Sequence, residues 1–221
     1  MGAATSTPEV SATGVRSGLR REPTQQRGQD TVERILDAAT AVLVEAGLEG
    51  FNTNVIAERA EVNVATVYSY FVDKFAILQQ LVHRLETSRQ VLISEWLGTL
   101  AGGGETWVTW FPAAVDQLVR FRTEFPGGVE IFAAIKAVPE MRETELALER
   151  TFSEQFALAL RAMAPALDAE RAAALGRVIV IAGAAVLDRA CRGGEPGEVD
   201  RTLVDAYVEM FTAALAPMLE G

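Results

Sequence analysis

The chain has 221 residues, of which 49% are hydrophobic, and its formal net charge is −10 at pH 7. This length allows a full hydrophobic core, either in one large domain or in a small domain joined to a larger one. The acidic balance argues against a protein that binds nucleic acid through bulk electrostatics, although specific readers also use helix N-termini, hydroxyls and amides.

Neither secretion nor membrane insertion is expected. The N-terminal segment has no apolar stretch of the kind found in signal peptides. The longest apolar run, Val178 to Leu187, has ten residues, well short of the roughly 20 that cross a bilayer. The single cysteine, Cys191, excludes an internal disulfide and a thiolate metal cluster. We therefore expect a cytoplasmic protein.

Residues 1–24 predict a flexible arm that ends in basic residues. They are rich in Ser, Thr, Gly, Ala and Pro, so burial of apolar surface cannot offset the entropy of ordering them. Arg16, Arg20, Arg21 and Arg27 lie at or just beyond the end of this arm, where they could reach DNA phosphates or a minor groove. The alternative is a solvated tail without a binding role.

Residues 25–75 predict three helices. The first, over residues 25–45, has a regular apolar stripe and ends at Gly47, which suits a C-cap. Two short helices follow, with N-cap oxygens from Asn52 or Thr53 and then from Asn63, and the first of them is expected to stop near Glu61. The apolar positions of the second short helix are Val64, Val67, Tyr68 and Phe71. This spacing is typical of a helix-turn-helix, with Tyr68 expected to face the core.

The rest of the chain predicts only further helices. Asp73 is the N-cap of a long helix that stops before the glycines at 102–104. Further helical segments are expected near residues 105–125, 129–137, 140–164, 168–192 and 199–219. No alternation with a period of two competes with them, so we predict an all-α fold.

The residues from the second short helix to the start of the long helix form a pattern that resembles a known family. Small, hydroxyl, aromatic and basic side chains stand at fixed offsets in Thr66, Val67, Tyr68, Tyr70, Phe71 and Lys74. With these residues, Thr31–Leu81 resembles the DNA-binding domain of TetR-family transcriptional repressors. Two positions depart from the usual pattern, because Glu61 and Ala65 stand where the family commonly has glycine. Glu61 must then adopt a left-handed turn that glycine takes freely.

The resemblance implies a domain organisation and an assembly. An N-terminal helix-turn-helix domain of three helices, residues 25–75, would be joined by a long helix to a larger helical domain, residues 76–221, that binds an effector and dimerises. In this family the long helix carries the effect of the ligand to the DNA-reading helices. The last two long helices typically pair into a four-helix bundle in a homodimer.

Candidate DNA-binding residues are those that core packing does not need. Short side chains would let the second short helix enter a major groove, where amides and methyl groups contact bases and hydroxyls contact phosphates. The predicted set is Asn52, Thr53, Asn54, Asn63, Val64, Ala65, Thr66, Ser69, Tyr70 and Lys74. Thr53 and Lys74 are the expected phosphate contacts. The alternative is an ordinary polar surface.

An unusual number of aromatic residues in the C-terminal part predicts an apolar effector pocket between helices. The predicted lining is Trp107, Trp110, Phe111, Val115, Phe132, Phe152 and Phe156. The alternative for each residue is core packing. Polar groups for this pocket could come from Asp116, Gln117, Arg120 and Arg122, most of which are expected to lie on the surface.

Two glycines in the most apolar helix predict a close helix contact. Gly176 and Gly183 lie seven residues apart on one face and weaken the helix by about 1 kcal/mol each relative to alanine. We expect the tight contact at Gly183 to be the subunit interface or, alternatively, the border of the ligand pocket.

Together with these patterns, the resemblance implies a ligand-responsive transcriptional repressor. It would bind a palindromic operator as a homodimer and be released by a small, mostly apolar effector. No enzyme, cofactor or metal motif is present, and His83 is the only histidine. The alternative is a helical small-molecule-binding or scaffold protein that no longer reads DNA. It is suggested by the excess of acidic side chains in residues 1–75 and by Glu61.

Overall fold

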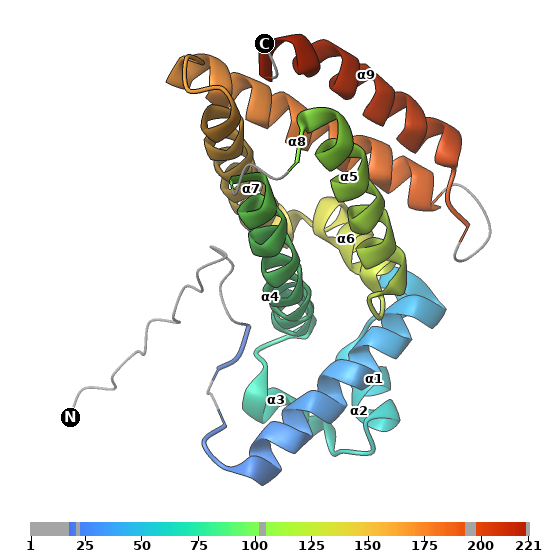
Figure 1. Ribbon diagram of the computed structural model, residues 1–221. Helices are drawn as coiled ribbons and strands as arrows, with labels where there is room; N and C mark the ends of the chain where they lie inside the picture. Colours follow the sequence, from blue (N-terminus) through green and yellow to red (C-terminus); the bar gives the residue numbers. More distant parts are fainter. Residues whose placement is uncertain (1–17, 21–22, 102–104, 193–197, 220–221) are drawn as a thin grey trace. The chain divides into compact units, whose positions relative to one another are not determined.

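The computed structural model describes residues 18–20, 23–101, 105–192 and 198–219, and these residues form an all-α fold (Figure 1). In the described chain there is one isolated β-bridge but no strand. The elements are α1 (Gln26–Gly50), α2 (Thr53–Arg59), α3 (Val64–Tyr70), α4 (Lys74–Ala101), α5 (Trp107–Glu124), α6 (Gly128–Ala137), a 3-10 turn (Pro139–Met141), α7 (Arg142–Met163), α8 (Ala169–Arg192) and α9 (Arg201–Leu219). The predicted fold class is confirmed.

The chain divides into two compact units. The first unit extends to Thr87 and includes Glu130–Glu145, and the second contains Ser88–Val129 and the chain from Leu146 onward. The division falls inside α4, some 12 residues beyond the functional boundary that the sequence predicts at residue 75. Both units therefore contain part of this long helix.

The first unit is built on the apolar face of α1. The predicted stripe is buried in full and consists of Val32, Ile35, Leu36, Ala39, Val42 and Leu43. Gly47 interrupts the helix with a φ of 61°, as the predicted C-cap position requires. Phe51, Ile56, Val67 and Phe71 are also buried, so α2 and α3 contribute to the same core.

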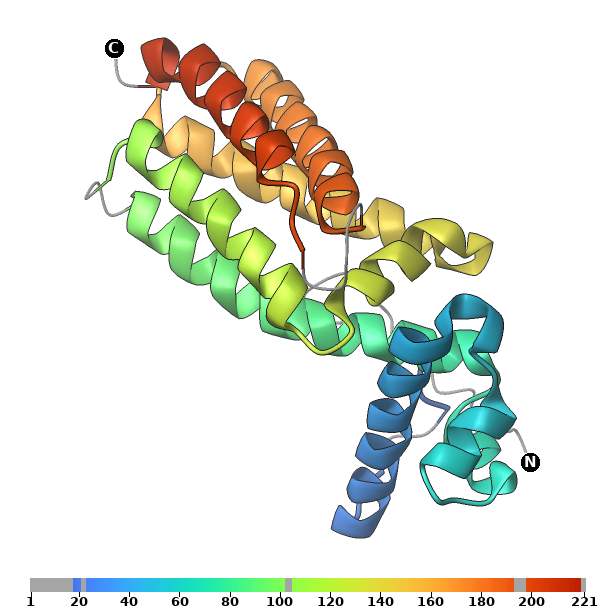
Figure 2. The same ribbon diagram turned by 90° about the vertical axis from the view of Figure 1, so that its right-hand side faces the viewer.

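The second unit packs α5, α8 and α9 around an aromatic core. Trp107 stacks on Phe111 at 4.5 Å between ring centroids, and the Trp107 indole N–H donates to the carbonyl of Phe211, 3.2 Å away. Both views of the ribbon show α9, in red, alongside α8, in orange (Figures 1 and 2). By length and composition α9 could cross a membrane, but Tyr207, Phe211 and Leu215 are buried in the core, as in a helix of a globular domain.

The two glycines of α8 pack within the same chain, so the prediction that the close contact at Gly183 is the subunit interface is wrong, while the alternative that Gly183 borders a ligand pocket stays a prediction. A Cβ on Gly183 would lie 2.8 Å from the hydroxyl oxygen of Tyr207, which donates to the carbonyl of Ile179 at 2.8 Å. A Cβ on Gly176 would lie 2.6 Å from the backbone oxygen of Ser153. The lack of a side chain at Gly183 therefore lets α9 pack closely against α8, and the lack of one at Gly176 does the same for α7.

We predict that Gly176→Ala destabilises the protein by about 1–3 kcal/mol, because the added methyl group meets backbone atoms that cannot move independently of α7. The matched control is Gly98→Ala in α4, where a Cβ would meet nothing within 4 Å. That change should stabilise the helix by up to about 1 kcal/mol. Urea denaturation of both variants measures the difference, and equal effects of the two changes would contradict the close packing at Gly176.

Candidate functional site

The helix-turn-helix presents most of its predicted DNA-binding residues to solvent. Asn54, Asn63, Ala65 and Ser69 are exposed, and Thr53, Val64, Thr66, Tyr70 and Lys74 are partly exposed. Val67, in contrast, is fully buried and holds α3 against the core. The surface of α3 thus combines the short side chains of Ala65, Thr66 and Ser69 with an aromatic hydroxyl from Tyr70.

Two of the predicted asparagines are N-caps. The Asn52 Oδ1 accepts hydrogen bonds from the backbone N–H groups of Asn54 and Val55, and its Nδ2 donates to the carbonyl of Gly50. The Asn63 Oδ1 accepts from the N–H of Ala65 at 2.8 Å. A bidentate contact with adenine needs both the oxygen and the nitrogen of an amide. The side chain of Asn54 makes no such cap, so it is the best-placed of the three for base recognition.

Tyr68 faces solvent, and the prediction that it faces the core is wrong. Its side chain is 43% exposed, and its hydroxyl lies 3.0 Å from the Thr53 Oγ1, to which it is hydrogen-bonded. Val67 and Phe71 already fill the core on this side of α3. Tyr68 therefore links α3 to the first turn of α2 and adds a hydroxyl to the same surface.

The turn between α2 and α3 is held by an arginine that the sequence analysis missed. Glu61 has a φ of 54°, the only positive φ among the described residues other than glycine. The Arg34 Nη2 donates to the carbonyl of Ala60 at 2.6 Å and to that of Glu61 at 3.2 Å. These two bonds from α1 give a hydrogen-bond donor to each carbonyl group of the turn. They help to hold Glu61 in a left-handed conformation that is unfavourable for a residue with a side chain. They thereby set the direction in which α3 leaves the turn.

The N-terminal segment before α1 is attached to the end of α3. The backbone N–H of Arg20 donates to the carbonyl of Tyr70 at 2.8 Å, and Leu19 pairs with Phe71 in an isolated antiparallel bridge. Residues 18–20 thus differ from the expected flexible arm. Arg16 and Arg21 lie outside the described residues.

A notch of about 480 Å³ extends the surface of α3 to the start of α1. It is lined by Pro23, Thr24, Gln25, Arg27, Gly28, Thr31, Ser69 and Tyr70. Gln25 makes no side-chain cap at the N-terminus of α1, where the positive end of the helix dipole lies. The guanidinium of Arg27 adds a positive charge. These groups favour an anion at this part of the surface.

The predicted effector residues divide between the two units. Phe132 lies on α6 in the first unit, and the other six lie in the second. Trp107, Phe111 and Val115 are buried in the core, while Trp110 meets Phe156 edge-on at 6.1 Å between ring centroids. These contacts give the aromatic residues a packing role. Their role in binding a ligand stays a prediction.

The four polar candidates near these aromatic residues also divide. Asp116 pairs with Arg120 and Arg201 on the surface, as expected. Gln117 is also exposed, as expected, and its side-chain oxygen accepts a hydrogen bond from the Trp96 indole N–H at 2.5 Å. Arg122 is buried and lies 3.3 Å from the carboxylate of Asp188 on α8. Burial lowers the pKa of Arg122 to about 10, while the Asp188 charge opposes that shift, so the guanidinium is positively charged at pH 7.

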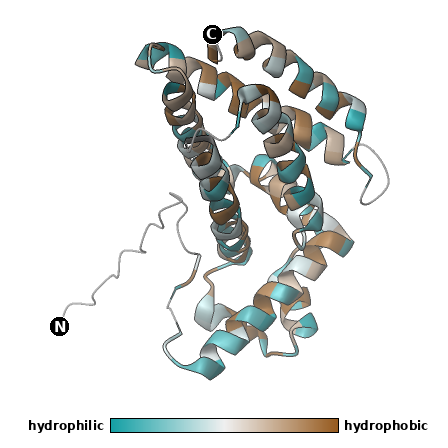
Figure 3. Ribbon diagram, viewed as in Figure 1, coloured by the Kyte–Doolittle hydropathy of each residue, from teal (hydrophilic) through white to brown (hydrophobic). Residues whose placement is uncertain are grey.

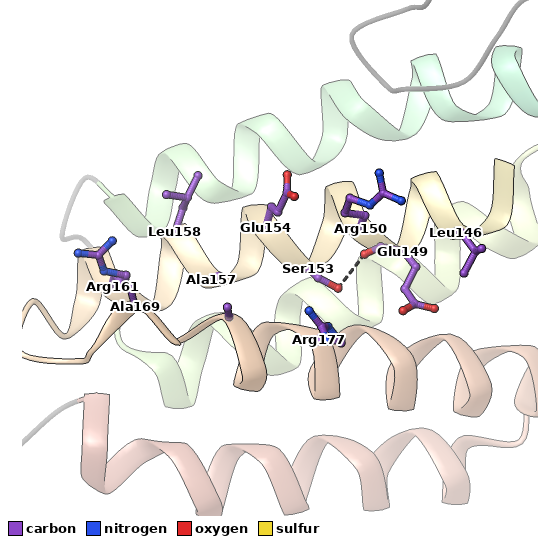
Figure 4. A pocket seen from close by; sticks show the side chains of 11 residues that line it. Leu146, Glu149, Arg150, Ser153, Glu154, Ala157, Leu158, Arg161, Ala169 and Arg177 are labelled. Atoms are coloured by element: carbon purple, nitrogen blue, oxygen red, sulfur yellow. Dashed lines mark hydrogen bonds between the residues drawn. The ribbon is translucent and has the colours of Figure 1, made fainter. Parts of the chain in front are cut away.

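A separate groove of about 580 Å³ lies between α7 and α8 (Figure 4). Arg150, Arg161 and Arg177 line it together with Glu149 and Glu154. None of the predicted effector residues contributes to it. Leu146, Ala157, Leu158, Ala169 and Ala173 add apolar surface, so the lining is mixed.

Comparisons with known proteins agree with this arrangement. Residues 35–81 match the domain described as bacterial regulatory proteins, tetR family, and residues 106–215 match the one described as tetracyclin repressor-like, C-terminal domain. The chain is also 34% identical over 70 residues to the uncharacterized HTH-type transcriptional regulator YvkB of Bacillus subtilis. That match covers 32% of this chain and 37% of YvkB, so it spans little more than a third of the curated relative.

Solved structures share the fold along most of the chain. A TetR-family transcriptional regulator from Syntrophomonas wolfei is similar with a TM-score of 0.66 and 15% identity, covering 86% of this chain and 96% of that one. SmeT, the repressor of the Stenotrophomonas maltophilia multidrug efflux pump SmeDEF, is similar with a TM-score of 0.63 and 22% identity, covering 86% and 92%.

We predict that Arg34→Ala lowers the free energy of unfolding by about 1 kcal/mol, because two turn carbonyl groups lose their donor. Glu61→Gly should raise it by about 1 kcal/mol, because glycine takes a positive φ without steric cost. The control is Arg84→Ala, which removes an exposed pairing with Asp37 and should change stability by less than about 0.5 kcal/mol. If Arg34→Ala lowers the free energy of unfolding no more than Arg84→Ala does, the role of Arg34 at the turn is contradicted.

Proposed function

Because the chain belongs to the TetR family of bacterial transcriptional regulators, we propose that it is a homodimeric repressor that binds a near-palindromic operator. A small, mostly apolar effector that enters the C-terminal domain releases the operator. The observation that carries this proposal is the surface of α3, where short side chains and the hydroxyl groups of Tyr68 and Tyr70 lie on a helix that is fixed at both ends. The protein acts in the cytoplasm, on double-stranded DNA and not at a membrane.

The DNA contacts divide into two kinds. Asn54, Ala65 and Thr66 face the base edges of a major groove, while the notch at the start of α1 and Lys74 contact the phosphates. Residues 1–75 contain seven basic and ten acidic side chains, so counterion release contributes little to the binding free energy. Weak non-specific binding and a shallow dependence on salt follow from this charge balance.

The proposed dimer uses apolar stripes that α8 and α9 leave exposed. Figure 3 shows hydrophobic residues, in brown, along both helices. The exposed positions are Ala174, Val178, Ile181 and Ala185 on α8, and Leu203, Ala206, Met210 and Ala213 on α9. Val178, Ile181 and Met210 are 53%, 47% and 57% exposed. Two copies of these helices, related by a two-fold axis, would form a four-helix bundle and bring two reading helices to one operator.

A second candidate function is a helical small-molecule-binding or scaffold protein that no longer reads DNA. The net charge of −3 on residues 1–75 and the acidic side chain of Glu61 at the turn favour it. A mobility-shift assay with the DNA upstream of the gene separates the two functions. A discrete shifted band at nanomolar to micromolar protein supports the repressor, and no shift at any of these concentrations supports the second candidate.

We predict that Lys74→Ala weakens operator binding roughly tenfold, because a charged hydrogen bond to phosphate is lost. The slope of log affinity against log salt should become shallower by about 1. Arg84→Ala removes the same charge from a position already paired with Asp37 and serves as the control. Fluorescence anisotropy at several salt concentrations measures both quantities. An unchanged salt slope in Lys74→Ala would rule out a phosphate contact at this residue.

We predict that Ile181→Glu shifts the protein to monomer at micromolar concentration, because a carboxylate buried without a partner costs about 2 kcal/mol or more. Leu158→Glu on α7 is the matched control, since Leu158 is 68% exposed and lies outside both stripes. Sedimentation velocity distinguishes the two variants. A stable dimer of Ile181→Glu would show that the subunits associate through another surface.

A further inference from the structure

Two glutamine side chains form an incomplete amide pair inside the second unit. The Gln155 Nε2 on α7 donates to the Gln90 Oε1 on α4, 3.1 Å away. The other two polar atoms, the Gln90 Nε2 and the Gln155 Oε1, are buried and have no hydrogen-bond partner among the described residues. One donor and one acceptor are therefore left over from the same pair.

This imbalance does not depend on how the amides are oriented. If both amide groups were turned by 180°, Gln90 would donate to Gln155, and the remaining atoms would again be one acceptor and one donor. A buried polar atom without a hydrogen bond destabilises the folded chain. The pair can therefore bind a group that both donates and accepts a hydrogen bond.

Aromatic surface borders the pair on α7. Phe152 lies one turn before Gln155, and the guanidinium carbon of Arg89 lies 3.7 Å from the centroid of its ring. Phe156 follows Gln155 directly and meets Trp110 edge-on. A ligand that reaches the amide pair would therefore contact aromatic rings along its apolar part.

We propose that Gln90 and Gln155 bind the polar end of the effector, and that this end is an uncharged group with a donor and an acceptor, such as a carboxamide or lactam on an aromatic body. The assignment rests on the proposed ligand response. A carboxylate offers no donor to the free Gln155 oxygen, and an ammonium group offers no acceptor to the free Gln90 nitrogen. Only a group with both functions completes the pair.

The test is calorimetric titration of the full chain, without DNA, using three probes of equal ring size: 2-naphthamide, 2-naphthoate and naphthalene. The protein should bind 2-naphthamide at least roughly tenfold more tightly than either of the others, since one tenfold step is the scale of a net hydrogen bond. Equal affinity for the amide and the hydrocarbon, tighter binding of the carboxylate, or no binding of any probe would each overturn the proposal.

Variants separate recognition from folding. The double change Gln90→Met with Gln155→Met keeps side-chain size and removes the whole pair, so the melting temperature should stay the same or rise while the preference for 2-naphthamide disappears. Gln79→Met removes a partly exposed amide from the part of α4 that belongs to the first unit and should keep that preference. A double variant that folds and still prefers the amide contradicts the assignment.

The outcome is distinguishable from failure of the repressor function. A protein that prefers 2-naphthamide but shifts no upstream DNA retains the amide site and loses the repressor assignment. A protein that binds its operator and shows no amide preference retains the repressor assignment and loses the amide site.

Discussion

The left-handed turn at Glu61 is the constraint on which the DNA-reading geometry depends. A side chain at a φ of 54° is strained, and the carbonyl groups around it need donors. Arg34 supplies those donors from α1, so the longest helix of the first unit fixes the angle between α2 and α3. The N-caps at Asn52 and Asn63 then fix where the two short helices begin. The direction of α3 follows from these contacts together, and DNA reading depends on that direction.

In the second unit, the arrangement of the helices depends on close packing at two glycines. Gly176 and Gly183 lower the intrinsic stability of α8, yet they let α7 and α9 approach its backbone. The Tyr207 hydroxyl then reaches the carbonyl of Ile179, and burial raises the pKa of this tyrosine. The glycines face neighbours in the same chain, and the proposed dimer uses the exposed apolar positions of α8 and α9. The incomplete pair of Gln90 and Gln155, the proposed contact for the polar end of the effector, also lies in this unit.

Local sequence signals predicted the helices. The features that the sequence did not predict depend on contacts between helices. The caps at Asn52, Asn63 and Asp73 and the stop at Gly47 depend on residues within a few positions, so the sequence indicated them correctly. Tyr68 has the spacing of a core residue, but Val67 and Phe71 fill the core, and that choice depends on how α3 packs against α2. Arg34 reaches the turn across 26 residues and leaves no periodic signal. The partners of Gly183 and Gln155 depend in the same way on how helices far apart in the chain pack together.

A footprint of the purified protein on the DNA upstream of its gene tests the central claim most directly, namely that two copies of α3 read one operator. We expect one protected stretch with two similar halves whose centres lie about one helical turn, or roughly 34 Å, apart, because a two-fold dimer places its reading helices on one face of the duplex. Protection of a single half-site, uniform protection along the fragment, or no protection at saturating protein would contradict the account.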